Sequence, residues 1–204
     1  MPPRGRFVST VSKRLISPEE YLRQERLAES KSEYLRGEVF AMSGASYAHT
    51  VIKDNLARSL GNQMEGGPCR VLTSDMRVKV SATGLYTYPD VVIVCDAPQF
   101  EDKVFDTLLN PHVIIEVLSD STEKYDRGKK FAHYRQIPSF QEYVLVAQDR
   151  PSMERHVRQA DGTWLTSFFE DVAGTFEFAS VPARIPLAEV YRDVPFPQPP
   201  TFSG

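Results

Sequence analysis

The stretch His112-Val113-Ile114-Ile115-Glu116-Val117-Leu118 decides how this chain is interpreted. From Val113 onward every residue except Glu116 is apolar, and such a run is typical of a strand buried on both faces of a sheet. A carboxylate is costly to bury in such a run unless it is paired or binds a cation. Glu116 is therefore either half of a buried ion pair or a metal ligand.

A second acid has a similar setting. Asp90 opens the apolar run Val91–Val94, directly after Tyr88-Pro89. By itself it could be a strand-end acid that caps a turn. Two such acids on neighbouring short strands, however, suggest a divalent metal site for phosphodiester chemistry. We expect Mg²⁺, with Mn²⁺ as an alternative, because Mg²⁺ needs few protein oxygens and keeps several waters. Asp90, Glu116 and the backbone carbonyl of Val117 would supply them.

The surrounding pattern predicts an α/β domain with a mixed sheet flanked by helices and additional C-terminal antiparallel strands. Ser17-Pro18-Glu19-Glu20 is typical of a helix start. The predicted helices span 17–28, 48–64 and 124–136, and a hairpin turns at Gly37 within 34–42. The predicted strands span 70–80, 86–94, 112–118, 142–147, 152–158, 163–170 and 174–180, and 96–110 is expected to be a loop.

A chain of 204 residues suggests one domain, which we place at 15–193. We expect 1–14 to be a flexible basic arm and 194–204 to be a proline-rich tail. The formal net charge of −3 excludes a wholly basic nucleic-acid coat but permits a local basic groove. We expect no membrane segment and a cytoplasmic location, because no apolar stretch is long enough to span a bilayer.

Cys69 and Cys95 are too few for a disulfide framework and lack the spacing of zinc ligands. We interpret them as partly buried thiols of a cytosolic protein.

Lys130 lies four residues after Asp126 on the predicted helix, so the two share a face. They could form a solvated ion pair, or Lys130 could act beside the acids. Basic residues also gather on this helix and could contact a phosphate backbone: Lys124, Arg127, Lys129, Lys130 and Arg135. His49 could be a general base or a substrate contact, but we favour a local contact at the helix surface.

Several motifs together resemble the Uma-two family of endonucleases. They are Pro89-Asp90, Glu116–Thr122, Asp126, Lys130 and Tyr134, with further likeness at Gly37-Glu38, Ala48-His49, 74–78 and 138–143. The resemblance covers about 17–193 and implies the restriction-endonuclease-like fold of the PD-(D/E)XK nuclease superfamily. One departure is Asp120, where the family usually has proline.

The resemblance also implies roles. Asp90 and Glu116 match the metal ligands, and Glu38 matches an early acid that can support the metal or its water. The superfamily lysine usually lies two residues after the glutamate, where this chain has Leu118. Lys130 matches the family's lysine on the following helix.

We therefore expect a Mg²⁺-dependent endonuclease that hydrolyses phosphodiester bonds of DNA, with Asp90, Glu116, Lys130 and Glu38 as catalytic residues. A homodimer would suit the cutting of both strands of a duplex. The alternatives are a catalytically inactive nuclease-fold protein that acts in nucleic-acid binding or assembly, and hydrolysis of another phosphate ester.

Overall fold

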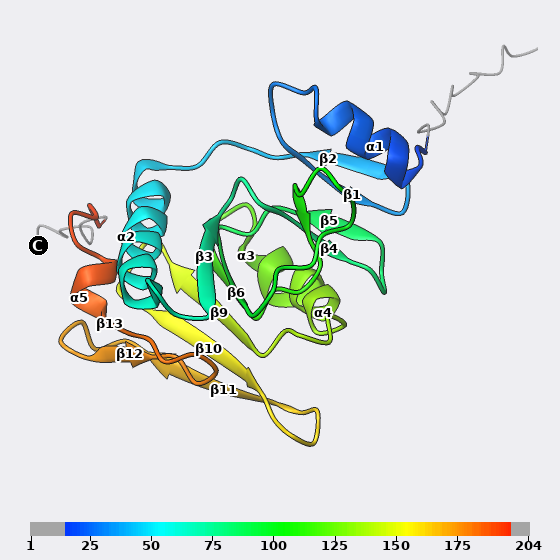
Figure 1. Cartoon of the computed structure of the whole chain (residues 1–204). Coiled ribbons are helices and arrows are strands. Elements are labelled where there is room, and N and C mark those ends of the chain that lie inside the picture. Colours follow the sequence, from blue (N-terminus) through cyan, green and yellow to red (C-terminus); the bar gives the residue numbers. More distant parts are fainter. Residues whose placement is uncertain (1–14, 197–204) are drawn as a thin grey trace, which may run out of the picture.

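A six-stranded mixed sheet forms the centre of the computed structural model, which describes residues 15–196 (Figure 1). Its strand order is β11-β10-β9-β8-β6-β3. The strands β8 and β9 pair in parallel, and the other neighbours are antiparallel. The bounds are β3 Cys69–Thr73, β6 Val91–Cys95, β8 Val113–Leu118, β9 Glu142–Ala147, β10 Met153–Arg158 and β11 Trp164–Phe169. The mixed sheet confirms the predicted fold class.

A second sheet of five strands has the order β2-β1-β5-β4-β7. Its strands are β1 Ser32–Leu35, β2 Glu38–Ala41, β4 Arg77–Val80, β5 Leu85–Thr87 and β7 Thr107–Leu108. A separate antiparallel pair consists of β12 Thr175–Glu177 and β13 Arg184–Pro186. The short strand β7 lies in the segment 96–110, which the sequence had indicated to be a loop.

The two predicted strands 70–80 and 86–94 are wrong in one respect, because each is divided between the two sheets. The first breaks at a turn where the Met76 N–H donates to the Thr73 carbonyl over 2.9 Å. The second breaks at Tyr88-Pro89, since proline has no N–H to donate to a ladder. These two breaks place Asp90 at the junction of the sheets.

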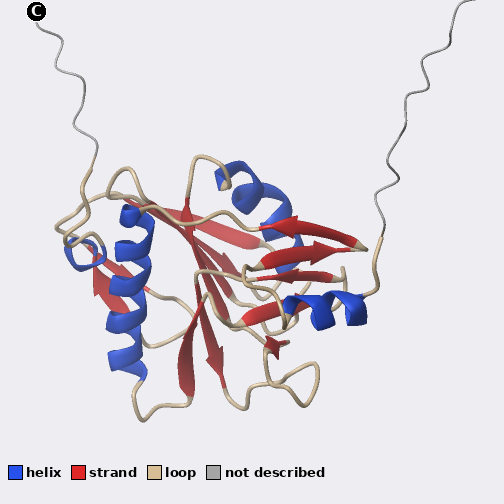
Figure 2. Ribbon diagram, turned by 90° about the horizontal axis from the view of Figure 1, so that it is seen from above, coloured by secondary structure: helices blue, strands red, loops and turns tan. Residues whose placement is uncertain are grey.

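Helices cover both faces of the large sheet (Figures 1 and 2). The helix α2, Tyr47–Met64, packs Ile52, Leu56 and Leu60 on one face. On the other face lies a segment of three helical turns, α3 Glu123–Tyr125, a π-helical turn Asp126–Lys130 and α4 Phe131–Tyr134. The remaining helices are α1 Pro18–Glu25, whose predicted cap is confirmed because Ser17 Oγ accepts from the Glu20 N–H, and α5 Leu187–Val190.

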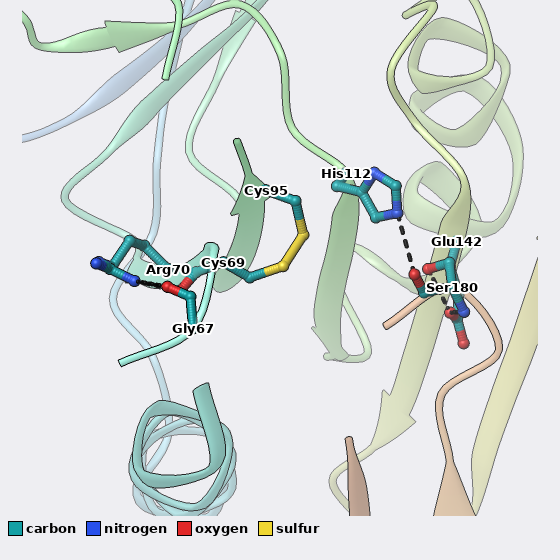
Figure 3. Close-up of a disulfide and its surroundings, with 7 residues drawn as sticks. All are labelled: Gly67, Cys69, Arg70, Cys95, His112, Glu142 and Ser180. Carbon is teal, nitrogen blue, oxygen red and sulfur yellow. Dashed lines mark hydrogen bonds between the residues drawn. A yellow bond between two sulfur atoms is a disulfide. The ribbon is translucent and has the colours of Figure 1, made fainter. Parts of the chain in front are cut away.

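The interpretation of Cys69 and Cys95 as free thiols is wrong, because they form a disulfide (Figure 3). The antiparallel register of β3 and β6 sets them directly opposite each other, with their Cα atoms 4.0 Å apart. Across 15–196, no helix has the length and apolar character that a membrane crossing requires.

The chain ends were predicted to be a flexible arm and a proline-rich tail. The arm, 1–14, lies outside the described residues, as does 197–204. The start of the predicted tail packs on the α2 side of the core through Val194 and Phe196. The Phe196 ring lies 5.6 Å from that of Tyr191, so the ordered fold extends slightly beyond residue 193.

Candidate active site

Asp90 and Glu116 lie side by side at the junction of the two sheets. The strands β6 and β8 are antiparallel neighbours with Val91 opposite Ile115, and the next pair in this register is Asp90 and Glu116. Both acids point away from α2, because Val91 and Ile115 occupy the α2 face. Asp90 Oδ2 accepts from the Val117 N–H over 2.8 Å, and the Asp90 N–H approaches Glu116 Oε2 at 3.4 Å. The predicted adjacency of the two acids is therefore confirmed.

Lys130 reaches the same place from the helical segment. Its Nζ lies 2.9 Å from Glu116 Oε1, 3.3 Å from Glu33 Oε1 and 3.4 Å from Asp126 Oδ1. Only 7% of the Lys130 side chain is exposed. Asp126 and Lys130 bound the π-helical turn, a wide turn that often occurs at functional sites. The structure thus brings Lys130 to the carboxylates, rather than leaving it on a solvated helix face.

Burial and charge act in opposite directions on the titration of this group. Burial raises the pKa of Glu116 to about 8, against the opposing effect of Lys130. Burial would lower the pKa of Lys130, but the carboxylates of Glu116, Glu33 and Asp126 outweigh it and raise that pKa well above its usual value. Lys130 is therefore a permanent cation. Tyr134, a residue of the family motif, donates its hydroxyl to Glu116 Oε1 over 2.8 Å.

The acid of the β1–β2 hairpin that contacts Lys130 is Glu33, which the sequence analysis missed. Glu33 contacts Lys130 and accepts from the Thr87 hydroxyl, whereas Glu38 is not among the residues that line the cavity around Asp90. Both acids lie on one face of the β1–β2 hairpin, Glu33 opposite Phe40 and Glu38 opposite Leu35. Glu38 therefore belongs to the next cross-strand pair on that face, the pair that it forms with Leu35. Period-two spacing does not separate the two positions, so no signal in the sequence distinguished them.

His49 contacts Asp90 instead of making a purely local contact. Its Nε2 lies 2.8 Å from Asp90 Oδ1, and the two side chains are 14% and 15% exposed. His49 sits in the first turn of α2, where Ser46 Oγ caps the helix by accepting from the His49 N–H. Both oxygens of Asp90 therefore have a protein partner, His49 at Oδ1 and the Val117 N–H at Oδ2.

These side chains surround a cavity of about 730 Å³. Five acids line it, namely Glu33, Asp90, Glu116, Asp120 and Asp126, against three lysines, Lys31, Lys53 and Lys130. Of the basic cluster predicted on the helix, Lys130 alone belongs to this lining. Carboxylates therefore outnumber lysines around this cavity.

Two of the cavity's carboxylates, Asp90 and Glu116, are of the donor type that hard divalent cations use. No group of three or more His, Cys, Asp and Glu side chains within 15–196 has the geometry of a complete metal site. Mg²⁺ does not need such a cage, because one or two carboxylates and several waters suffice. Asp90 and Glu116 are two carboxylates of this kind, and Val117 also lines the cavity.

Two adjacent acids and a lysine thus meet beside the central strands of a mixed sheet, which is the arrangement expected of a nuclease fold. The family model described as "Uma2: Putative restriction endonuclease" matches residues 18–185. The chain therefore belongs to this family, and the resemblance noted in the sequence is confirmed.

Two uncharacterised proteins of Synechocystis are similar over most of their length. The first is 35% identical in an alignment that covers 89% of this chain and 94% of that protein. The second is 34% identical in an alignment that covers 81% of this chain and 94% of that protein. A crystal structure from Anabaena variabilis, described as "a putative nuclease belonging to DUF820", superposes with a TM-score of 0.71. The superposition covers 86% of this chain and 97% of the Anabaena chain. The two sequences are 16% identical, so this likeness concerns the fold.

Proposed function

We propose that this protein is a Mg²⁺-dependent endonuclease that hydrolyses phosphodiester bonds of DNA. The observation that carries the proposal is the meeting of Asp90, Glu116 and Lys130 at the floor of one cavity, with Lys130 Nζ 2.9 Å from Glu116. The family and the nuclease fold support hydrolysis of a nucleic acid. The excess of carboxylates in the cavity supports the requirement for a metal, with Mn²⁺ as an alternative ion.

Asp90, Glu116 and the Val117 carbonyl would hold the ion. When bound, a divalent cation polarises the phosphate and lowers the pKa of a coordinated water. Each protein group then has a role that follows from its contacts. His49 and the Val117 N–H hold the Asp90 carboxylate in place from two sides. The Tyr134 hydroxyl does the same for Glu116.

Lys130 would act as a hydrogen-bond donor and not as a base, because its raised pKa keeps it protonated. A fixed ammonium group can orient the attacking water and stabilise negative charge that develops on the phosphoryl oxygens. Glu33 and Asp126 would keep its Nζ at this position from two directions. We therefore assign Glu33 the supporting role that the family resemblance had given to Glu38.

Cleavage assays test this proposal. Supercoiled plasmid and branched DNA are incubated with the wild type, Asp90→Asn or Glu116→Gln, in Mg²⁺ and in EDTA. Asp54→Asn, an exposed acid on α2, is the matched control. We expect cleavage by the wild type and the control only, and only in Mg²⁺. Equal activity in all four proteins would reject this site.

The non-catalytic alternative has one observation in its favour. The ion pair between Lys130 and Glu116 already compensates a buried acid without any metal. Calorimetric titration with Mg²⁺ separates the two possibilities, because a purely structural ion pair binds no ion. Heat of binding that Asp90→Asn abolishes supports the nuclease.

An enzyme that cuts both strands of a DNA duplex would use one active site for each strand. This is the reason for expecting a homodimer. Light scattering of the purified protein tests that expectation.

A further inference from the structure

The first turn of α2 carries His49 and lies outside the apolar core. The first buried residue of this helix is Ile52, so the core holds α2 only beyond its first turn. Within 15–196, the preceding residues 43–45 make no backbone–backbone hydrogen bond, although all three line the cavity. The first N–H groups of a helix have no partner inside the helix. The position of His49 therefore depends on local polar contacts.

Ser46 makes these contacts with both its carbonyl and its hydroxyl. The carbonyl accepts from the N–H and from the hydroxyl of Thr50, both over 3.0 Å. Ser46 Oγ accepts from the His49 N–H over 3.1 Å and donates to Gln148 Oε1 over 2.6 Å. A hydroxyl has one donor and two acceptor positions, so it can make both bonds at once. Ser46 therefore links the first turn of α2 to Gln148.

Gln148 leaves the large sheet at the end where the acids lie. It follows β9 directly, and Ala147, the last residue of β9, is opposite Leu118 in the parallel pair with β8. Glu116 lies two residues before Leu118 on the same strand. Gln148 and Ser46 also line the cavity together with the two acids. The bond between them thus ties the start of α2 to the part of the sheet that carries the site.

A chain of contacts consequently runs from the sheet to Asp90 through the first turn of α2. It begins at Gln148, passes through Ser46 to the His49 backbone, and ends where His49 Nε2 lies 2.8 Å from Asp90 Oδ1. A carboxylate oxygen accepts, so the Nε2–H of His49 is the donor in the last contact. Groups that hold a metal-binding side chain from behind set its direction, and their loss typically costs 10- to 100-fold in metal affinity.

We propose that Ser46 and Gln148 are positioning residues, which hold His49 on Asp90 and thereby set the direction of the Asp90 carboxylate. The inference rests on the proposed nuclease function where it concerns the metal, whereas the contact between His49 and Asp90 exists without one. An N-cap that only stabilises its helix needs no bond beyond that helix. The bond from Ser46 to Gln148 goes beyond it, and this bond distinguishes the positioning role.

Calorimetric titration with Mg²⁺ tests the proposal with four single variants. Ser46→Ala removes both bonds of the hydroxyl, Gln148→Leu removes only the bond to the sheet, and Ser46→Thr keeps both, because threonine also caps helices. The matched control is Ser17→Ala, which removes the same kind of cap from α1. We expect Ser46→Ala and Gln148→Leu to weaken binding by about 10-fold, and Ser46→Thr and Ser17→Ala to bind as the wild type does.

The double variant Ser46→Ala/His49→Ala shows whether Ser46 acts through His49. We expect it to bind Mg²⁺ within about twofold of His49→Ala alone, since the effects of residues that act through a shared partner do not add. If Ser46→Ala weakens binding by the same factor with and without His49, or leaves the wild-type affinity unchanged, the inference is wrong and the proposed nuclease function stands.

A metal-free measurement separates the inference from the proposed function. In ¹⁵N spectra of the imidazole rings, His49→Ala identifies the signal of His49 among the four histidines. We expect Ser46→Ala and Gln148→Leu to shift this signal toward that of an imidazole without a hydrogen-bond partner, and Ser17→Ala to leave it in place. If the wild type binds no Mg²⁺ but these shifts occur, the positioning role stands and the proposed function falls. A signal that moves in neither variant overturns the positioning role, whether or not the metal binds.

Discussion

Replacing Lys130 by methionine tests whether it is the counter-charge of the buried acids. The substitution keeps most of the side-chain volume but leaves Glu116 and Asp126, which are 5% and 4% exposed, without a cation. Removing one partner of a buried ion pair costs about 3–5 kcal/mol. For a chain of this size each kcal/mol shifts the melting temperature by about 2–4 °C, so we expect a fall of roughly 6–20 °C.

The matched control is Lys129→Met, because Lys129 is exposed on the same turn. Thermal unfolding of both variants in EDTA is followed by circular dichroism across a range of pH. The deficit of Lys130→Met should be largest above about pH 8, where Glu116 is ionised, and should shrink as the pH falls. This sign follows because a protonated acid needs no counter-charge. If Lys130→Met and Lys129→Met have the same melting temperature at every pH, Lys130 does not compensate the charge of these acids.

Three further outcomes are expected. His49→Ala should weaken Mg²⁺ binding by about 10- to 100-fold in calorimetry, since His49 orients Asp90 at 2.8 Å; an unchanged affinity would remove it from the site. Reducing the disulfide, whose cysteines are 26 positions apart, should lower the free energy of unfolding by about 3–4 kcal/mol in urea titrations with and without reductant, and coincident curves would contradict this. The pKa of Asp106 is lowered to about 2, chiefly by hydrogen bonds from Arg26, so its stabilising effect is present above about pH 4 and is lost as the pH falls toward 2. Arg26→Ala should therefore melt below the wild type at neutral pH and approach it near pH 2, and a constant difference would refute the linkage.

The local parts of the site could be predicted from the sequence. Apolar runs interrupted by one acid placed Asp90 and Glu116 on adjacent strands, and the structure has them as neighbours in register. A spacing of four residues put Asp126 and Lys130 on one helix face, and both line the cavity. Each of these inferences needed only a period of two or of about four residues, which local sequence supplies.

The remaining parts depend on contacts between distant segments. Strand continuity through 70–80 looked plausible because the apolar alternation barely lapses at the turn after Thr73. That turn sends the chain to a second sheet, and the packing of this sheet against the first decides that Glu33, and not Glu38, faces Lys130. The pairing of Cys69 with Cys95 likewise follows from the register of β3 and β6. A periodicity read along one segment carries no information about such registers.

The position of Lys130 explains how a nuclease-like centre forms without a lysine on the strand. Leu118 occupies the superfamily's usual lysine position, but it is buried in the core together with Tyr134 and Tyr143. The helical segment supplies the cation instead, and the Tyr143 hydroxyl ties it to the sheet by donating to the Asp126 carbonyl over 3.2 Å.

The resulting group is not balanced in itself. One lysine faces three carboxylates, and Asp126 Oδ1 is buried without a hydrogen bond from any described residue. Apolar side chains of similar volume would stabilise the fold at least as well. Burial raises the pKa values of both Glu116 and Asp126, so proton uptake by these acids relieves part of the excess negative charge, and a cation bound beside them would compete with those protons.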